Sequence, residues 1–261
     1  MPDALNVAKT GLNAQQERMS VISNNLANVN TVGFKRDRAN FETLLYQDIR
    51  ASGAQTSQNT QLPTGLAIGT GVRIVSSEKL YSQGNIINTD NSLDMTIEGD
   101  GFFQVLMPDG QMAYTRAGNF SKNSAGLMVS SNGYPVEPAI TIPPNASSIS
   151  ISRVGIVSVG VPGQAAAQVV GNLQIASFPN NGGLKPVGEN LAMATGASGA
   201  PVIGNPGAAG LGKILQGSLE SSNVNVVEEL VNMIETQRAY EVNSKAINAV
   251  DSMQKFLTQN I

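Results

Sequence analysis

The chain of 261 residues contains no cysteine and no histidine. Without cysteine there can be no disulfide framework and no thiolate metal site. Without histidine the commonest general base and the commonest metal ligand are both missing, which disfavours hydrolytic and metal-dependent catalysis. We therefore expect no catalytic residue, no metal site, no cofactor and no small-molecule substrate.

Charge is also scarce, because only 13% of the residues are charged and the net charge is −3. This share is about half of that in ordinary globular domains. No nucleic-acid partner is expected, since proteins that bind nucleic acids present a basic face. Residues 51–72, 154–184 and 190–212 contain no charged side chain at all. A soluble monomer needs surface charge, so these tracts suggest surface that other protein chains cover.

Long hydrophobic runs are missing as well. No stretch approaches the roughly 18 apolar residues of a membrane span. The start, MPDALNVAKTGLNAQQ, lacks the apolar core of a secretory signal. From these residues alone the expectation is a cytoplasmic protein.

The sequence does contain an amphipathic pattern at each end. In the first segment only Gln15 interrupts a 3-4 spacing, and Gly33 stands where a left-handed cap would end the helix. The apolar positions there are Leu5, Ala8, Leu12, Met19, Ile22, Leu26 and Val29. At the other end, Asn225 and Glu228 have the spacing of a capping box. A long helix is predicted to follow, with a largely apolar stripe at Val227, Val231, Ile234, Arg238, Val242, Ala246, Ala249, Met253 and Phe256.

The end of the first helical pattern, SNNLANVNTVGF at residues 23–34, is rich in asparagine. Asparagine is a poor helix former, because its side chain competes for backbone hydrogen bonds. On a helical wheel Asn24, Asn25 and Asn28 form an arc opposite the apolar stripe. We predict that these uncharged amides meet another subunit, where they can form hydrogen bonds without the desolvation cost of a buried charge.

The middle of the chain alternates between apolar and polar residues, with turns at Pro108-Asp109-Gly110 and Asn132-Gly133. No helical pattern lies between these strands, so the sheet should be antiparallel. Residues 51–64 are interpreted as a flexible arm, and residues 194–212 as a loop or extended return segment.

The predicted fold class is α+β and discontinuous. The N- and C-terminal helices form a coiled-coil-like domain, extended arms connect it, and the centre is an antiparallel β-domain. The domains are residues 1–34 with 222–261 (helical), 35–66 (connecting arm with an insertion) and 67–221 (β-domain). A single α+β globule is the alternative.

Three features point to other roles, and none is specific. Residues 207–214 have the G-x-x-x-x-G-K spacing of a phosphate-binding loop, but Ile214 stands where Ser or Thr must bind magnesium. Asp94 and Glu98 share one strand face, yet their backbones would be roughly 13 Å apart, which is longer than glycosidase geometry allows. An exported polysaccharide-acting enzyme is nevertheless the alternative from a different class. The basic cluster 35–38 is either a solvated turn or a contact for a helix C-terminus or an acidic neighbour.

Three motifs together resemble a known family. They are TGLNAQQERMSVISNNLANVNTVGFKR near the start, IEGDGFFQV followed by YTRAGNF in the middle, and SNVNVVEELVNMIETQRAYEVNSKAINAVDSMQKFL at the end. On these motifs the chain is similar to the flagellar axial proteins, which comprise rod, hook and hook-associated subunits. The length, the insertion after the first motif and the ending QGSLESSNVNVVEELVNMI most closely resemble distal rod members. A proximal rod or hook-type subunit is the alternative.

The resemblance implies a structural protein and not an enzyme. It implies export through the flagellar type III export apparatus without a cleaved signal peptide, which replaces the cytoplasmic expectation. It places the chain in the basal body, in the rod that spans the periplasm. The implied partners are further copies of the chain in a straight hollow helical tube that transmits torque, proximal rod subunits, the hook protein, and the peptidoglycan and outer-membrane ring proteins around the rod.

Two sets of residues are predicted to make the contacts of that tube. The inter-subunit helix contacts are Leu5, Leu12, Met19, Ile22, Asn24, Asn25, Leu26, Asn28, Val29, Val227, Val231, Ile234, Val242, Ala246, Met253 and Phe256. The insertion, which is expected to fill gaps between subunits and to stiffen the rod, contributes Tyr46, Gln47, Asp48, Ile49, Arg50, Gln55, Gln58, Leu62 and Pro63.

Overall fold

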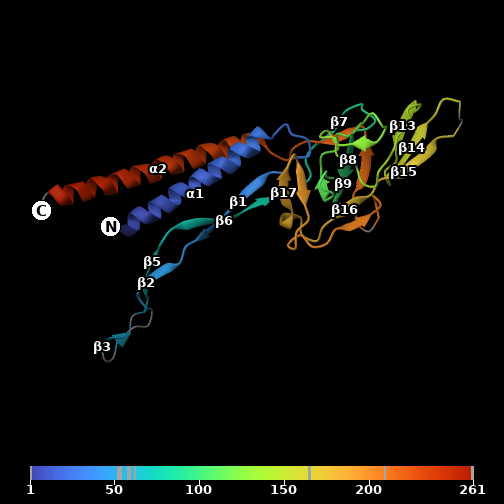
Figure 1. Cartoon of the computed structure of the whole chain (residues 1–261). Helices are drawn as coiled ribbons and strands as arrows, with labels where there is room; N and C mark the ends of the chain where they lie inside the picture. The colour runs from blue at the N-terminus through green and yellow to red at the C-terminus, as the bar shows by residue number, and fades with distance from the viewer. Residues whose placement is uncertain are drawn as a thin grey trace. The chain divides into compact units, whose positions relative to one another are not determined.

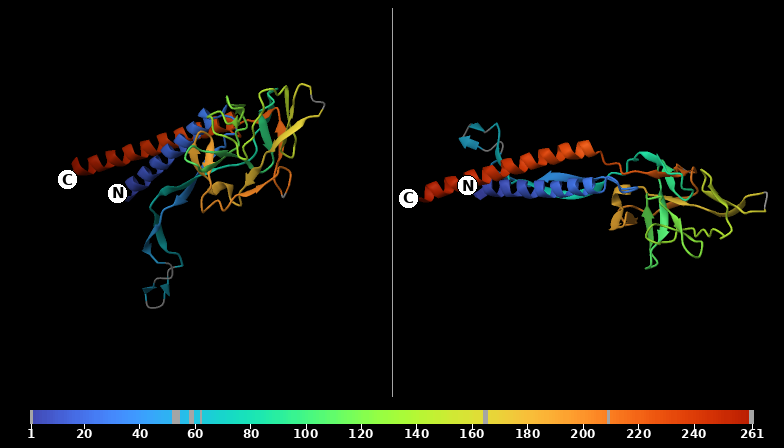
Figure 2. Two further views of the ribbon diagram at one scale, coloured as in Figure 1. Left: turned by 45° about the vertical axis from the view of Figure 1, so that its right-hand side comes forward. Right: turned by 90° about the horizontal axis from the view of Figure 1, so that it is seen from above.

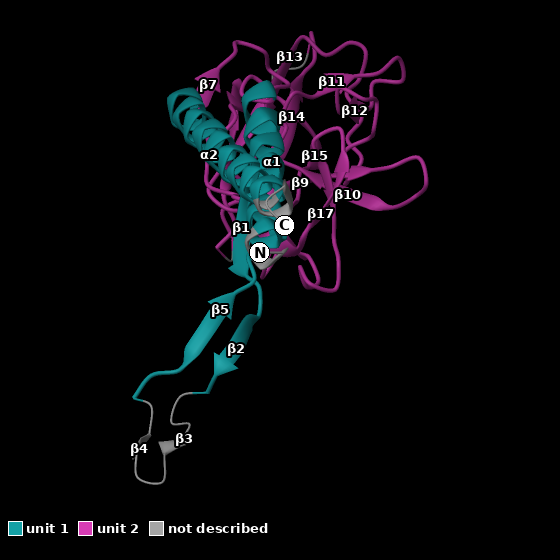
Figure 3. Cartoon of the chain, turned by 90° about the vertical axis from the view of Figure 1, so that its left-hand side faces the viewer, with its two compact units in different colours: residues 1–27, 37–78, 225–261 teal, residues 28–36, 79–224 magenta. Residues whose placement is uncertain are grey.

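A computed structural model describes residues 2–51, 55–57, 60–61, 63–163, 166–208 and 210–259. The chain divides into two compact units, which Figure 1 labels by element and Figure 3 separates by colour. Unit 1 comprises residues 1–27, 37–78 and 225–261, and unit 2 comprises residues 28–36 and 79–224. Residues 67–78, which the sequence analysis assigned to the β-domain, therefore belong to the unit that contains the terminal helices.

The helices of unit 1 are α1 (Pro2–Ala27) and α2 (Val226–Gln259). They pack side by side and run antiparallel, as both views of Figure 2 show. The predicted C-terminal helix and its cap are confirmed, because the backbone N–H of Val227 donates to Asn225 Oδ1 at 3.1 Å. Within the described residues, no helix has both the length and the hydropathy of a membrane-spanning segment.

Helix α1 ends earlier than predicted. Its last residue is Ala27, so Asn28 and Val29 lie outside the helix and Gly33 is not its cap. The Asn28 side chain takes part in a turn instead: its Oδ1 accepts a hydrogen bond from Thr31 Oγ1 at 3.1 Å, and the Asn28 carbonyl accepts one from the Thr31 N–H at 3.1 Å. This local bonding is the competition with helical hydrogen bonds that asparagine offers.

The described residues between 37 and 79 form a two-stranded ribbon. β1 (Asp37–Thr43) lies beside β6 (Val72–Lys79), β2 (Tyr46–Arg50) pairs antiparallel with β5 (Leu66–Gly69), and β3 (Gln55–Ser57) pairs antiparallel with β4 (Thr60–Gln61). In the described residues, the predicted extended connecting arm is thus paired, strand to strand, with residues 66–79. Every residue of β2 is exposed, so no buried face imposes the alternation from which strands are recognised in a sequence.

Unit 2 is the predicted antiparallel β-domain. Its main sheet has six strands in the order β17-β18-β10-β9-β16-β19, and a second sheet has the order β13-β14-β15. The main-sheet strands are β9 (Phe102–Leu106), β10 (Met112–Thr115), β16 (Ile175–Ser177), β17 (Lys185–Gly188), β18 (Leu191–Met193) and β19 (Val202–Gly204). The second sheet contains β13 (Ser148–Ile151), β14 (Ile156–Gly160) and β15 (Gln168–Asn172). The remaining elements are β7 (Ile86–Asn88), β8 (Met95–Glu98), β11 (Ser121–Lys122), β12 (Met128–Val129), β20 (Lys213–Gln216), β21 (Ser218–Glu220) and the 3₁₀ turn η1 (Asn181–Gly183).

Both predicted turns are present. β9 and β10 pair antiparallel around Gly110, and Val129 bridges Pro135 around Gly133. Each of these glycines has a positive φ, +81° and +85°, which glycine adopts without a Cβ clash. The tract 194–212 is only partly a loop, since it contains β19.

The core of unit 2 lies on both faces of the main sheet. The neighbours Phe102 and Phe103 are 2% and 0% exposed and point to opposite faces. Phe103 packs edge-to-face on Phe120, with 5.1 Å between the ring centroids. Phe102 packs on Phe178 in the same way, with 5.9 Å between the centroids. Gly118, from the motif YTRAGNF, lies against the backbone of Met95, where a Cβ would overlap the carbonyl oxygen. This motif therefore closes the core against β8.

Candidate assembly interface

Polar and small residues contribute to the face of α2 that packs on α1. Arg18 of α1 donates to Asn232 Oδ1 of α2 at 3.4 Å, and the fully buried Thr236 donates its hydroxyl to the Asn232 carbonyl at 2.6 Å. Gly11 comes so close to α2 that a Cβ would lie 3.1 Å from Asn243 Nδ2. Met233, Ile247 and Val250 of α2 are half-buried as well, so only part of the apolar surface of α2 is covered within the chain.

The apolar stripe of α2 points away from α1. The exposed fractions are 69% for Val227, 51% for Val231, 51% for Ile234, 64% for Val242, 57% for Met253 and 68% for Phe256. We call these residues, with the exposed Ala246, the α2 stripe. On a helical wheel Val227, Ile234 and Phe256 lie opposite the face that contains Asn232, Thr236 and Asn243. The two terminal helices do pack on each other, but the α2 stripe is left exposed in the single chain, so its predicted role as an inter-subunit contact stays a prediction.

The predicted contact residues on α1 differ in how far the chain itself buries them. Leu5, Leu12, Met19 and Leu26 are half-buried in the chain, and Asn24 is exposed. Ile22 and Asn25 are only 4% and 1% exposed. Asn25 is already paired within its own chain, because Nδ2 donates to the Asp37 carbonyl and Oδ1 accepts from the Asp37 N–H, both at 2.9 Å. Ile22 and Asn25 are thus covered within the single chain, where Asn25 fixes the first residue of β1 to α1.

The residues of the predicted insertion lie on the ribbon. Tyr46, Gln47, Asp48, Ile49 and Arg50 make up β2 and are all exposed. Tyr46 is 61% and Ile49 55% exposed, so the ribbon presents apolar side chains on a strand with no buried face. Gln55 belongs to β3, opposite Gln61, and Pro63 is exposed. Gln58 and Leu62 lie outside the described residues.

Within unit 2, three segments meet close to the points where the chain leaves the unit. We call residues 33–36, 80–85 and 220–223 the neck. The Gly33 N–H donates to the Glu220 carbonyl at 2.8 Å, and the Arg36 N–H donates to Asn223 Oδ1 at 2.7 Å. The Asn223 amide in turn donates to the Leu80 carbonyl at 2.8 Å. Each segment is thus bonded to at least one other, although they are far apart in the sequence.

A buried cluster of charges lies at the neck. Lys35 Nζ is 2.5 Å from Glu220 Oε1, and Arg116 Nη1 is 3.4 Å from Glu220 Oε2. The three side chains are 3%, 4% and 0% exposed for Lys35, Arg116 and Glu220. Lys35 also donates to the Ser82 carbonyl at 2.7 Å, and the Gly84 N–H donates to Glu220 Oε1 at 2.9 Å. One carboxylate therefore joins two cations and a backbone amide.

Burial acts on both cations of the cluster. It lowers the pKa of Lys35, while the charge of Glu220 and the hydrogen bond to it act in the opposite direction. It lowers the pKa of Arg116 too, against the charges of Glu220 and Asp100. Glu220 therefore favours the charged form of Lys35 and offsets part of the cost of burying Arg116.

This cluster could not be recognised from local sequence patterns. Lys35 and Glu220 are separated by 185 positions, and no local spacing connects them. The interpretation of residues 35–38 as a solvated turn is wrong for Lys35, which is buried. Arg38 does lie at the surface, in an ion pair with Glu78 at 2.8 Å.

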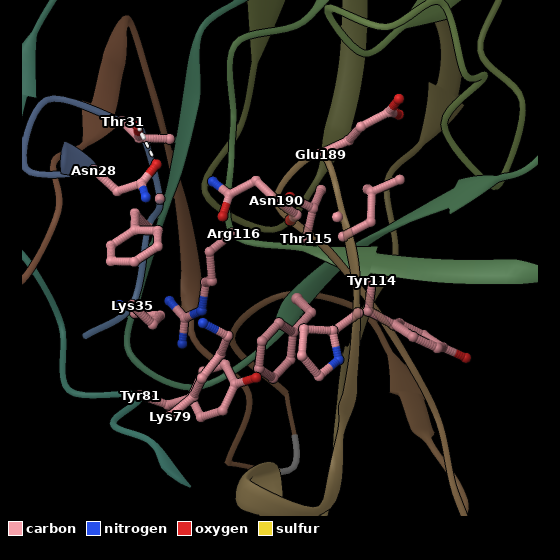
Figure 4. Close-up of a pocket in the computed structure, with 17 residues that line it drawn as sticks. Asn28, Thr31, Lys35, Lys79, Tyr81, Tyr114, Thr115, Arg116, Glu189 and Asn190 are labelled. Atoms are coloured by element: carbon pink, nitrogen blue, oxygen red, sulfur yellow. Dashed lines mark hydrogen bonds between the residues drawn. The ribbon is translucent and has the colours of Figure 1, made fainter. Parts of the chain in front are cut away.

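A pocket in unit 2 adjoins the neck (Figure 4). Phe34, Tyr114 and Arg116 line it, together with the turn Glu189-Asn190. Both turn residues have positive φ angles, +53° and +61°, as a two-residue hairpin turn between β17 and β18 requires. Asn190 Nδ2 donates to the Val32 carbonyl at 2.5 Å. The turn thus holds the segment that enters the neck, and we assign the pocket to this structural role.

The chemical alternatives do not form sites. Asp94 accepts hydrogen bonds from Thr89 Oγ1 at 2.6 Å and from Asn91 Nδ2 at 2.9 Å, so it stabilises a local turn. Glu98 is exposed and lies opposite Lys213 across two antiparallel strands. Lys213 and Ile214 belong to β20, whereas a phosphate-binding loop requires a helix N-terminus at that place. The phosphate-loop interpretation is wrong.

Comparison with known proteins matches three family models to the chain. Residues 5–35 match "Flagella basal body rod protein", residues 96–159 match "Flagellar hook protein FlgE/F/G D1 domain", and residues 215–260 match "Flagellar basal body rod FlgEFG protein C-terminal".

Relatives are similar over nearly the whole length. The flagellar basal-body rod protein FlgG of Buchnera aphidicola subsp. Schizaphis graminum is 55% identical over 99% of this chain and 100% of its own. The protein of the same name from Caulobacter vibrioides is 48% identical over 98% of both chains, and that from Bacillus subtilis is 37% identical over 94% of this chain and 93% of its own.

These matches and the fold define an axial protein of the flagellar rod and hook class. Within that class, the chain belongs to the family of flagellar basal-body rod proteins. It is a structural protein of the flagellar basal body and not an enzyme.

Proposed function

We propose that this chain is a subunit of the distal rod and polymerises with itself into a straight hollow helical tube. The tube transmits torque from the motor through the periplasm and the ring bushings to the hook. The observation that carries the proposal is the α2 stripe, whose large apolar side chains are all more than half exposed in the single chain. The similarity to rod proteins over almost the full length supports it.

The α2 stripe supplies the free energy of association. Complete burial of a Val, Ile, Met or Phe side chain is worth about 1.5–3 kcal/mol, so covering these half-exposed residues yields roughly half of that at each position. Most exposed residues of α1 are polar, among them Asn13, Gln16, Ser20 and Asn24, although Val7 is also exposed. Two unlike helix faces favour a head-to-tail contact, which gives an open filament and not a closed ring.

The inter-subunit contacts that we retain are the α2 stripe and the half-buried side of α1. Leu5, Leu12, Met19 and Leu26 would complete their burial in the tube, and Asn24, Asn28 and Val29 would lie at its contacts. The further partners are proximal rod subunits, the hook protein and the peptidoglycan and outer-membrane ring proteins. Export proceeds through the flagellar type III apparatus without a cleaved signal peptide.

Electron microscopy of the concentrated, purified full chain tests this function. We expect straight hollow tubes with helical symmetry. Curved tubes would favour the hook-type alternative, and monomers or closed rings at all concentrations would refute self-assembly.

The ribbon is proposed to stiffen the tube by filling gaps between subunits. Replacing Tyr46 and Ile49 together by Ser removes two exposed apolar side chains and leaves the backbone pairing of β2 with β5 intact. We expect tubes that still form but bend several-fold more easily, measured as persistence length in electron micrographs. Gln47→Ser, on the same exposed strand, is the matched control. Unchanged stiffness in the double variant would contradict the gap-filling role.

A further inference from the structure

The two edge strands of the six-stranded sheet differ in how well they are protected against pairing with another chain. β17 contains Lys185 and Pro186, and its pairing with β18 shifts register between Pro186 and Gly188. Charge, proline and bulges are the features by which natural edge strands avoid pairing with another chain. β19 has none of them: it reads Val202-Ile203-Gly204. In the part of the chain that the structure describes, only β16 pairs with it.

Both large side chains of β19 are exposed. Val202 is 52% and Ile203 50% exposed, although they are neighbours and point to opposite faces of the sheet. On the adjoining strand β16, Ile175 and Ala176 are both fully buried. The apolar character of the sheet therefore continues to its edge, where nothing in unit 2 covers the described side chains of β19.

Two uncharged tracts meet at β19. It lies within residues 190–212, which contain no charged residue. Asn205, directly after β19, accepts a hydrogen bond from Asn172 at the end of β15, with 2.9 Å between Nδ2 and Oδ1. β15 belongs to the second uncharged tract, 154–184, which exposes Val154 (49%), Ile156 (39%) and Val169 (62%). An exposed apolar surface without charge is typical of an interaction site.

We propose that β19 and the adjoining uncharged surface of β14 and β15 form an inter-subunit contact that a second copy of this chain covers. The inference rests on the proposed function, because copies of the chain are then the most abundant neighbours of each subunit. The protected β17 edge of a neighbour is a poor partner for β19, since Pro186 has no N–H to donate. The surface of the second copy that covers β19 is therefore not its β17 edge.

The test introduces the charge that β19 lacks. In the full chain, V202K and I203K should each raise the critical concentration for polymerisation by roughly tenfold or more, because a lysine must then be buried without a partner. The melting temperature of the monomer should change little, since both side chains are exposed in it. V187K is the matched control on the other edge strand, where Val187 is 37% exposed. Normal polymerisation of V202K and I203K would overturn the proposal.

Cross-linking identifies the neighbour directly. The chain has no cysteine, so I203C provides a unique site for a thiol-linked benzophenone. In pelleted polymer we expect photo-induced dimers joined to a peptide of a second copy, and far fewer dimers from V187C. Equal yields from the two variants would overturn the inference. If the unmodified chain forms no polymer, both the proposed function and this inference fail. If the unmodified chain polymerises and the lysine variants of β19 polymerise equally well, only this inference fails.

Discussion

Replacing Glu220 by Gln should destabilise unit 2 by roughly 3–5 kcal/mol, the usual cost of breaking a buried ion pair from one side. Glutamine has nearly the same size and can still accept the Gly84 N–H, so the change removes mainly the charge. Lys35 and Arg116 then remain 3% and 4% exposed without their carboxylate. The measurement is the free energy of unfolding of the full chain in urea, followed by near-ultraviolet circular dichroism of the aromatic core.

The control is Glu98→Gln, an exposed carboxylate of the same unit. Surface substitutions of this kind usually change stability by less than about 0.5 kcal/mol. A similar small effect for both variants would show that the Glu220 charge does not hold the neck together.

The same variant has a distinctive pH dependence. Burial lowers the pKa of Lys35 and Glu220 opposes that effect, so the Gln variant should lower the Lys35 pKa further. At pH values between the pKa of Lys35 in the folded chain and its ordinary value of 10.5, the unfolded chain binds more protons than the folded chain. The free energy of unfolding therefore rises with pH in this range. We expect the Glu220→Gln variant to regain part of its loss, relative to Glu98→Gln, as the pH is raised from neutral toward that value. A loss that is constant with pH would mean that Lys35 is not the destabilising group.

The spacing of apolar residues and the turn residues predicted the local elements of the fold. The two terminal helices, the Asn225 cap and the antiparallel hairpins around Gly110 and Gly133 all follow from spacing and turn residues. A hydrophobic stripe shows that a helix has an apolar face, but it does not show what covers that face. The α2 stripe therefore could be recognised in the sequence, whereas its direction away from α1 could not.

The neck could not be predicted, for a related reason. Glu220 lies next to segments that precede it by more than a hundred positions, and single charges in loops resemble solvated surface. The asparagines at residues 24, 25 and 28 stood out in the sequence, and they were predicted to meet another subunit. The partner of Asn25, however, is the Asp37 backbone of the same chain, because the chain returns along α1 as the ribbon begins.

Replacing Val231 and Ile234 together by Glu should abolish polymerisation. Both side chains are 51% exposed in the single chain, so the variant monomer should keep its helix content and its melting temperature. In a filament every copy would bury two carboxylates against an apolar surface, and each unpaired charge costs several kcal/mol. The critical concentration should rise by roughly a hundredfold or more, measured by sedimentation and electron microscopy.

The control adds the same charge elsewhere on the same helix. Gln237→Glu with Asn248→Glu changes two exposed positions of α2 that lie outside the α2 stripe. This variant should polymerise within a few-fold of the unchanged chain, because its new carboxylates stay in water. If the stripe variant lost helix content as a monomer, the stripe would be packed inside the chain. If it formed tubes as readily as the control, subunits would associate through another surface, and the exposed apolar face of α2 would need a different partner.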